Sequence, residues 1–301
     1  MLPDPFRTQR GAMAMLALTC LLWGGNYIAS KVVVAESPPF TAAFVRFVFA
    51  TLLVLALYAL TPGARWPRRE EWKNLAILGC AFFLYNLFFY SGLKATTSAN
   101  AALLAATSPV ITAVASAVSG KERVRVAQAL GLAASFTGVT FVVLKEGLRL
   151  NPGDVLVIAS SCIWSFYTLF GQRTMATLSP LAVTAFAWVV STILLFPAAL
   201  LERHTHGWFV FSTTAWWNLA YVVMFSSVAC FTWWYKGVSA VGPTRASVFL
   251  NLIPLTGLVL SPLLMKERLT LRQLLGAALI LGGVYLVAHY PARIRAQLRW
   301  A

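Results

Sequence analysis

The stretch FFLYNLFFY (residues 82–90) places aromatic rings around a single amide side chain. Phe82 and Asn86 are four residues apart and share one face if this stretch is helical, and Phe83 and Tyr90 flank that face. Rings beside an amide suit a ligand that has a ring or an alkyl chain and one polar end. We therefore expect these residues to contact a ligand. The alternative is that the rings face lipid and that Asn86 ties two helices together.

Two tryptophans, Trp23 and Trp164, lie near the middle of long apolar runs. A buried indole needs a partner for its N–H, and we expect both rings to line a binding cavity, with simple packing as the alternative. Asn26, Tyr27 and Tyr167 lie three or four residues from these tryptophans and are assigned to the same site.

Asn100 and Asn251 are further uncharged polar side chains inside apolar runs, where each must find a partner. They complete the predicted binding set. Trp188 also lies near the middle of a run, whereas the remaining tryptophans are expected in belts at the membrane interfaces. That group comprises Trp66, Trp72, Trp208, Trp216, Trp217, Trp233, Trp234 and Trp300.

Arg46 is the only charge well inside an apolar run, about 10 Å from the outer end of its helix at about 1.5 Å per residue. An intramembrane charge is a functional residue by default and needs a partner. Glu36 is the nearest acid in the sequence; otherwise Arg46 binds carbonyls at a helix end or extends outward to the interface. Both a structural tie and an electrostatic role in a transport pathway are open.

Pro109 and Pro254 interrupt two apolar runs at matching positions, 145 residues apart. Each proline lacks an N–H and leaves a carbonyl without its helical partner four residues earlier, at Ala105 and at Leu250. Paired breaks of this kind indicate the site and the moving parts of a transporter. We expect kinks that let helix ends open and close, and fixed kinks are the alternative.

The composition indicates the elements that must position these residues. Of the 301 residues 59% are hydrophobic and 11% are charged, against roughly 25% charged in soluble domains. Because this much apolar surface requires a membrane, we predict an all-α membrane protein with ten transmembrane helices. Their approximate bounds are 12–34, 40–60, 73–93, 97–118, 126–145, 153–172, 180–201, 215–236, 243–264 and 270–289.

The net charge of +15 is interpreted as a topology signal, because no stretch is polar and long enough to bind nucleic acid. Lys and Arg concentrate near the termini and in the joints between helices 2–3, 4–5, 6–7 and 8–9. Cytoplasmic loops carry such an excess, so residues 1–11 and 290–301 are predicted to be cytoplasmic tails of an inner-membrane protein.

Two segments 145 residues apart, SGKERVRVAQALG (119–131) and LMKERLTLRQLLG (264–276), share Lys-Glu-Arg and a later Gln and Gly. Glu122 and Glu267 would lie just before helices 5 and 10, where a carboxylate favours the positive end of the helix dipole. The shared phrase therefore indicates a duplicated turn between helices.

The duplication predicts two five-helix repeats, 12–145 and 153–289, joined by a linker, 146–152. Since five is odd, the second repeat must cross the membrane in the opposite direction to the first. Small residues on helices 5 and 10 suit close packing: Gly131, Ser135, Gly138, Gly276, Gly282 and Gly283.

Four segments together resemble the drug/metabolite transporter superfamily, specifically its EamA branch. They are WGGNYIASK (23–31), SPPFTAAFVRF (37–47), SPVITAVASAVSGKERVRVAQALG (108–131) and IPLTGLVLSPLLMKERLTLRQLLG (253–276). The resemblance implies a ten-helix inverted repeat with a substrate cavity between helices 1, 3, 4, 6, 8 and 9. The aromatic content is most similar to YddG-type exporters of aromatic and other apolar amino acids. Arg46 has no counterpart in the second repeat, where Trp188 stands in its place.

The chain has no ATP-binding loop, no nucleophile motif and no metal-ligand spacing, so we predict no cofactor, no metal site and no enzymatic activity. Acidic residues occur only near helix ends. Proton-driven carriers use buried carboxylates, so we expect passage down the gradient of the substrate. Coupling through a histidine or an acid at a helix end is the alternative.

These features predict a secondary transporter that exports small neutral or zwitterionic amphipathic solutes by alternating access. Apolar and aromatic amino acids are the foremost substrates, as the resemblance implies. The expected partners are this small molecule and the lipid bilayer, and not nucleic acid. A multidrug or other metabolite exporter of the same superfamily is the alternative, and a membrane-embedded enzyme is a remote one.

Overall fold

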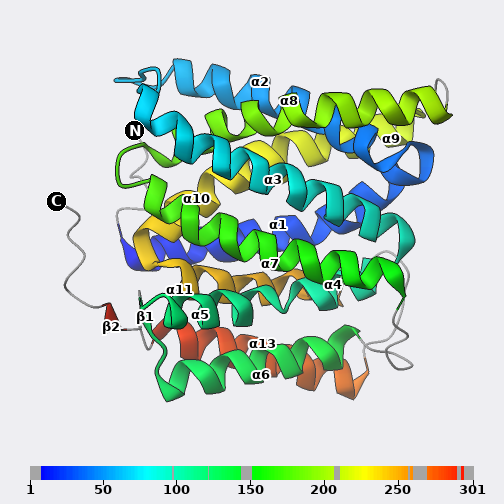
Figure 1. The fold of residues 1–301 in the computed structure, drawn as a ribbon. Coiled ribbons are helices and arrows are strands. Elements are labelled where there is room, and N and C mark those ends of the chain that lie inside the picture. Colours follow the sequence, from blue (N-terminus) through cyan, green and yellow to red (C-terminus); the bar gives the residue numbers. More distant parts are fainter. Residues whose placement is uncertain are drawn as a thin grey trace.

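The computed structural model describes residues 8–96, 98–120, 122–143, 151–206, 211–256, 258–259, 270–289 and 293–294, nearly all of them helical (Figure 1). The first half contains α1 (Gln9–Glu36), α2 (Pro39–Ala59), α3 (Arg69–Ala95), α4 (Ser98–Ala105), α5 (Ser108–Val118) and α6 (Val126–Val143). The second half contains α7 (Pro152–Thr174), α8 (Pro180–His206), α9 (Thr213–Tyr221), the π-helix η2 (Val222–Ala229), α10 (Cys230–Val241), α11 (Pro243–Val248), the 3-10 helix η3 (Phe249–Leu252) and α13 (Leu271–His289). Two short strands, β1 (Glu122–Arg123) and β2 (Arg293–Ile294), pair antiparallel.

Seven helices in the described residues are long and apolar enough to cross a membrane: α1, α2, α3, α7, α8, the unit formed by α9, η2 and α10, and α13. Shorter apolar helices at Leu103–Val118 and Val126–Val142 correspond to the fourth and fifth predicted spans. The ninth predicted span begins as α11 and η3, and its part beyond residue 259 lies outside the described residues. The predicted all-α membrane fold is confirmed.

The glutamines of the repeated phrase cap two helix starts. Gln128 Oε1 accepts the backbone N–H three residues earlier at 3.1 Å, ahead of α6, and Gln273 Oε1 does the same at 2.9 Å, ahead of α13. Each bond satisfies an N–H that a helix N-terminus would leave unpaired. The side chains of Glu122 and Glu267 lie outside the described residues, so their role at the helix dipole stays a prediction.

Helices α6 and α13 pack backbone to backbone. A Cβ placed on Gly138 would lie 2.5 Å from the carbonyl oxygen of Gly276, and one on Gly131 would lie 2.8 Å from that of Gly283. Real Cβ atoms do not come so close, so a larger residue would push these helices apart. In the duplicated sequence Gly276 corresponds to Gly131, and Gly283 corresponds to Gly138. Gly131 contacts Gly283 and Gly138 contacts Gly276, so the repeat converts one contact into the other. The two helices therefore run antiparallel about a local two-fold axis.

The packing of the other helices follows the same two-fold symmetry between the halves. Helix α3 packs against α7 as α1 packs against α9 and α10, and α2 packs against α8. Figure 1 shows α2 and α8 at one edge of the bundle and α6 and α13 at the opposite edge, with the start of α1 and the end of α13 at the same end. Because equivalent helices run in opposite directions, the second half is an inverted copy of the first.

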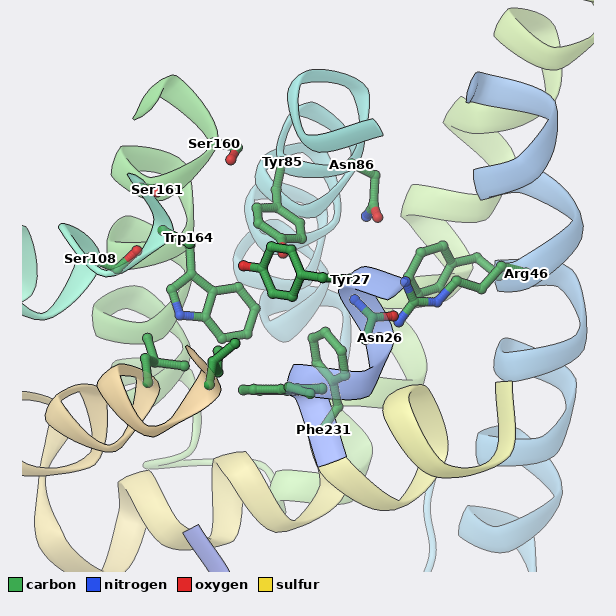
Figure 2. Close-up of a pocket in the computed structure, with 15 residues that line it drawn as sticks. Asn26, Tyr27, Arg46, Tyr85, Asn86, Ser108, Ser160, Ser161, Trp164 and Phe231 are labelled. Atoms are coloured by element: carbon green, nitrogen blue, oxygen red, sulfur yellow. The ribbon is translucent and has the colours of Figure 1, made fainter. Parts of the chain in front are cut away.

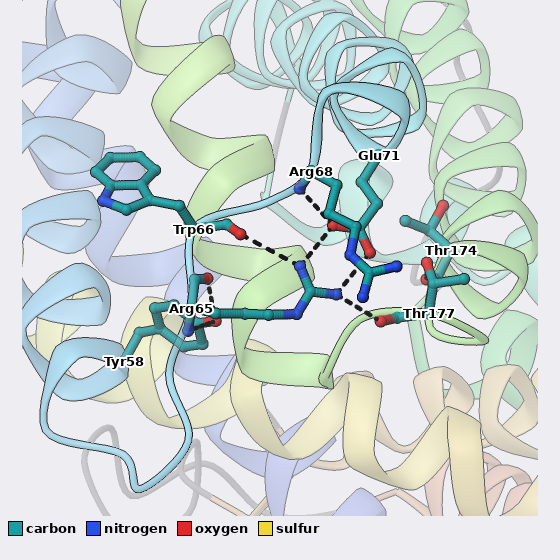
Figure 3. Close-up of polar contacts among 7 residues, drawn as sticks. All are labelled: Tyr58, Arg65, Trp66, Arg68, Glu71, Thr174 and Thr177. Atoms are coloured by element: carbon teal, nitrogen blue, oxygen red, sulfur yellow. Dashed lines mark hydrogen bonds and ion pairs between the residues drawn. The ribbon is translucent and has the colours of Figure 1, made fainter.

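The joint between α2 and α3 is fixed by an ion pair that also caps α3 (Figure 3). Arg65 holds Glu71 through two parallel bonds, Nη1 to Oε2 at 2.8 Å and Nη2 to Oε1 at 2.7 Å. Glu71 also accepts the backbone N–H of Arg68 at 2.6 Å. Hydrogen bonding to Glu71 raises the pKa of Arg65. Arg65 also donates to the Thr177 carbonyl at 3.4 Å, which links this joint to the one between α7 and α8.

Alanine at two adjacent glycines of α13 tests the close crossing. A Cβ at Gly283 collides with the Gly131 carbonyl, and overpacking typically costs about 1–3 kcal/mol, so Gly283→Ala should lower the thermal midpoint of the purified protein by several degrees. A Cβ at Gly282 meets no atom of the described residues within 4 Å, so the prediction that Gly282 packs closely is wrong. Gly282→Ala should be neutral or stabilising, since alanine favours a helix by roughly 1 kcal/mol. Equal midpoints in a fluorescence-detected size-exclusion melt would contradict the crossing.

Candidate functional site

A small cavity lies between the two halves (Figure 2). Its walls come from α1, α2, α3 and the α4–α5 break in the first half, and from α7, α10 and the η3 region in the second. In the view of Figure 2, Arg46 enters from one side and Trp164 from the other. The lining residues are Trp23, Asn26, Tyr27, Arg46, Phe47, Tyr85, Asn86, Ala105, Ser108, Ser160, Ser161, Trp164, Phe231, Leu250 and Ile253.

Aromatic rings form one wall of this cavity. Trp23 and Trp164 meet edge to face with centroids 5.4 Å apart, and Phe231 lies 5.2 Å from Trp23 and 5.6 Å from Trp164. Tyr85 adds a ring 5.3 Å from Trp164. Trp234, predicted in an interfacial belt, is instead fully buried beside both indoles, 5.3 Å from Trp23 and 5.5 Å from Trp164, so that prediction is wrong. Contacts of this kind fix the orientation of each ring.

The π-helix η2 supplies hydrogen-bond partners to the cavity wall. Trp23 Nε1 donates to the backbone oxygen of Ser226 at 2.8 Å. Ser227 Oγ donates to the Val222 oxygen five residues earlier at 2.9 Å, a bond that matches the wider π turn. Trp164 Nε1, by contrast, is buried without a partner among the described residues. The two indoles are therefore close neighbours with different polar surroundings.

Arg46 borders the cavity from α2, and only 4% of its surface is exposed. Nε donates to Ser227 Oγ at 2.9 Å, Nη1 donates to Tyr90 Oη at 2.9 Å, and Nη2 donates to Ser226 Oγ at 3.4 Å. The guanidinium carbon lies 4.9 Å from the centroid of the Phe47 ring. Three hydroxyls orient the charge, and because they are neutral they leave it uncompensated.

The partners expected for Arg46 do not hold it. Glu36 accepts instead from the backbone N–H and the hydroxyl of Ser212, at 2.8 and 2.7 Å, at the start of α9. The bonds of Arg46 go to side-chain hydroxyls and not to helix-end carbonyls, and its burial shows that it does not extend to the interface. These partner predictions are wrong because the π-helix brings two serines from the other half against α2.

Two amides contribute polar atoms to the lining. Asn26 Oδ1 accepts from Ser30 Oγ at 3.2 Å on the same helix. Asn86 Nδ2 donates to the Phe82 backbone oxygen at 2.7 Å, which leaves Asn86 Oδ1 buried without a partner among the described residues. An unpaired buried acceptor is unfavourable unless a ligand or a water supplies a donor. Asn86 therefore offers the cavity an unused acceptor.

The backbone departs from α-helix beside both predicted prolines. Helix α4 ends at Ala105 and α5 begins at Ser108, directly before Pro109, and η3 ends two residues before Pro254. Both residues predicted to lose a helical partner to the prolines, Ala105 and Leu250, line the cavity. The interruptions lie in the wall where a ligand would sit, and a gating role for the prolines is a proposal.

Six predicted residues are brought together on the lining: Trp23, Asn26, Tyr27, Arg46, Asn86 and Trp164. Five others lie off it, namely Phe82, Phe83, Tyr90, Tyr167 and Asn251. Phe82 stacks on Trp188 with centroids 5.6 Å apart, behind the wall. Asn251 Nδ2 donates to Ser135 Oγ at 2.6 Å and so ties η3 to α6. The side chain of Asn100 lies outside the described residues.

Sequence reasoning missed several lining residues. Tyr85 is three residues from Phe82, so the helical spacing used for Asn86 also indicates Tyr85. Ser160 and Ser161 lie one turn before Trp164 on α7, which is an equally available signal. Phe231 has no such signal, because η2 shifts the register of the helix directly before it.

Both the sequence and the fold of this chain are similar to those of known proteins. The model of the EamA-like transporter family matches the chain twice, at residues 10–144 and 151–289. A solved crystal structure that is 21% identical superposes with a TM-score of 0.74 and covers 93% of this chain and 96% of its own. The two chains therefore share their fold.

Relatives of similar length carry transporter names. An uncharacterized transporter of Archaeoglobus fulgidus is 31% identical over 278 residues, which cover 90% of this chain and 95% of that protein. The uncharacterized transporter YyaM of Bacillus subtilis is 26% identical, with 90% and 91% covered. A protein of Streptantibioticus cattleyicolor named "Probable terminal-alkyne amino-acid exporter" is 25% identical, with 92% of this chain and 93% of that protein covered.

Replacing each of the two cavity tryptophans with phenylalanine tests whether their indole N–H groups differ in hydrogen bonding. Trp23→Phe removes the bond to the Ser226 carbonyl and should cost about 1 kcal/mol of stability. Trp164→Phe loses a similar amount of ring packing but removes an N–H that has no partner among the described residues, so it should cost less stability than Trp23→Phe. Thermal unfolding of both variants in one detergent measures the difference. A larger loss for Trp164→Phe would show that the bonding pattern is wrong.

Proposed function

The chain belongs to the EamA-like transporter family, and from that premise we propose that it exports small neutral or zwitterionic amphipathic solutes, foremost amino acids with apolar or aromatic side chains. The observation that carries this proposal is the composition of the cavity wall, which combines aromatic rings with one buried cation and several uncharged polar groups. A ligand with a ring and a polar end would find a matching surface for each part.

The amino-acid class gains support from one relative, whose name describes an amino-acid exporter. A lipophilic cation would instead need an acidic group, and no carboxylate is found among the described lining residues. Arg46 would repel such a cation. The multidrug alternative is therefore less compatible with this cavity than an amino acid is.

Alternating access would use the inverted halves. At one end Glu36 joins the start of α9, and at the other end Arg65 joins the α7–α8 joint. These contacts occupy corresponding positions in the two halves, so opening one end would break one contact and leave the other in place. The backbone breaks at Pro109 and Pro254 would let the helix ends move without disturbing a regular hydrogen-bond ladder.

The membrane orientation is part of the same proposal. The start of α1 and the end of α13 lie at one end of the bundle (Figure 1). The excess of Lys and Arg in the joints on that side favours a cytoplasmic location for both tails, in the inner membrane.

Flux measurements test the substrate class. Liposomes that contain the purified protein should release radiolabelled phenylalanine, tryptophan and leucine faster than empty liposomes, and aspartate and lysine no faster. Trp164→Ala removes a ring from the cavity and should lower the initial rate by roughly tenfold, as loss of an aromatic anchor does. Trp217→Ala, at an exposed surface position, is the matched control and should keep the rate. The proposal fails if no amino acid is transported at a rate above that of empty liposomes.

The absence of a described carboxylate on the lining predicts facilitated passage without proton coupling. Liposomes with an imposed pH gradient should reach the same final distribution of phenylalanine as liposomes without one, although the initial rates can differ. A protonophore added at equilibrium is the control and should cause no release. Accumulation above the equilibrium level, reversed by the protonophore, would overturn the facilitator mechanism and leave the substrate class in place.

A further inference from the structure

We propose that Arg46 binds the carboxylate of the transported solute, so that the site selects an α-amino acid over the corresponding amine. This inference rests on the proposed function and adds the group that recognises the substrate. It starts from the position of the charge, which borders the cavity in the membrane interior with almost all of its surface buried.

No described carboxylate neutralises Arg46. Glu36 binds Ser212, and Glu71 is held by Arg65. Asp154 accepts from Thr96 and Asn151, Glu202 accepts from Thr41, and Glu70 is exposed in the first turn of α3. The acids of the described residues thus lie near helix ends. Burying a charge without a counterion costs several kcal/mol, roughly, so a charge in such a position indicates a functional role.

Other cations of the bundle have a structural explanation that Arg46 lacks. Lys31 Nζ donates to the carbonyls of Leu93 and Thr96, at 2.6 and 2.7 Å, at the C-terminal end of α3. Arg245 donates to the Ala288 carbonyl near the end of α13. The negative end of a helix dipole stabilises both charges. Arg46 contacts no helix end, so its charge is available to a ligand.

The hydrogen bonds of Arg46 use only some of its donors. A guanidinium has five N–H groups, and the three bonds to Ser227, Tyr90 and Ser226 use one on each nitrogen. One N–H on each terminal nitrogen has no partner among the described residues. Two such donors in one plane match the two oxygens of a carboxylate, the arrangement in which arginine binds acids most strongly. The three hydroxyls thus hold the guanidinium in place and leave two of its N–H groups for a ligand.

The rest of the lining suits the other two parts of an amino acid. Asn86 Oδ1 is an unpaired buried acceptor that an ammonium group can use. Trp164, Phe231 and Tyr85 provide the apolar wall for the side chain. The ammonium group has no acidic partner on the described lining, so the carboxylate must supply most of the polar binding energy. An amine without a carboxylate would place a second positive charge near Arg46.

Competition against radiolabelled phenylalanine on the purified protein tests the assignment with three probes. Unlabelled phenylalanine has both polar groups, phenethylamine lacks the carboxylate, and 3-phenylpropanoate lacks the ammonium group. The wild-type protein should bind phenylalanine about tenfold or more tighter than phenethylamine, which is the strength of hydrogen bonds to a charged group. Arg46→Gln should weaken phenylalanine and 3-phenylpropanoate by a similar factor and leave phenethylamine unchanged or tighter.

Two further variants serve as controls. Arg69→Gln removes an exposed charge at the start of α3 and should leave all three affinities unchanged. Arg46→Lys keeps the charge but not the paired donors, so the preference for phenylalanine should persist at a several-fold lower level. This variant and the wild-type preference give a result even if Arg46→Gln does not fold.

The outcomes separate this assignment from the proposed function. Equal affinities of the wild-type protein for phenylalanine and phenethylamine would overturn the role of Arg46, as would an equal loss of both ligands in a folded Arg46→Gln. Either result would leave an amino-acid carrier in place. Failure of the wild-type protein to bind any of the probes would overturn the proposed function, and the carboxylate assignment with it.

Discussion

Hydrocarbon offers no hydrogen-bond partner to a peptide group, so a chain that crosses a membrane must satisfy its backbone from within. This chain keeps to regular helix over most of its length and departs from it in the turn between α4 and α5, in the π-helix η2 and in the 3-10 helix η3. Each departure either lines the central cavity or bonds to a residue that does, since η2 holds both Trp23 and Arg46. Irregular backbone is thus found beside the cavity, whereas most of the polar lining residues, among them Arg46, Asn86 and Ser161, lie on regular helices.

The two halves share a scaffold but not a lining. Their glycines cross reciprocally in α6 and α13, and their prolines interrupt corresponding helices. The cavity is asymmetric because the equivalent of Arg46 in the second half is Trp188, which stacks on Phe82 behind the wall. The duplicated framework therefore surrounds a cavity with a single buried cation, Arg46, which has no counterion among the described residues.

The helices and their inversion were predictable from the sequence because each depends on the sum of many residues. Long apolar runs, the repeated offset and the odd number of helices per repeat each tolerate local errors. The lining depends on rotation about single helices, where one residue changes the direction of a side chain by roughly 100°. Tyr85 and Phe82 show the consequence, because one lines the cavity and the other packs behind it. The inward positions of Phe231 and Trp234 follow a π-helix that no pattern in the sequence indicates, and the serines that hold Arg46 lie in that same segment.

The contact of Trp23, Trp164 and Trp234 gives the protein an internal optical reporter. Their ring centroids lie 5.3 to 5.5 Å apart, so excitation absorbed by one indole passes readily to the others before emission. The ultraviolet fluorescence of this trio should therefore be strongly depolarised. A solute that enters between the rings would alter their coupling and with it the colour of the emitted light, so occupancy can be followed without attaching a dye.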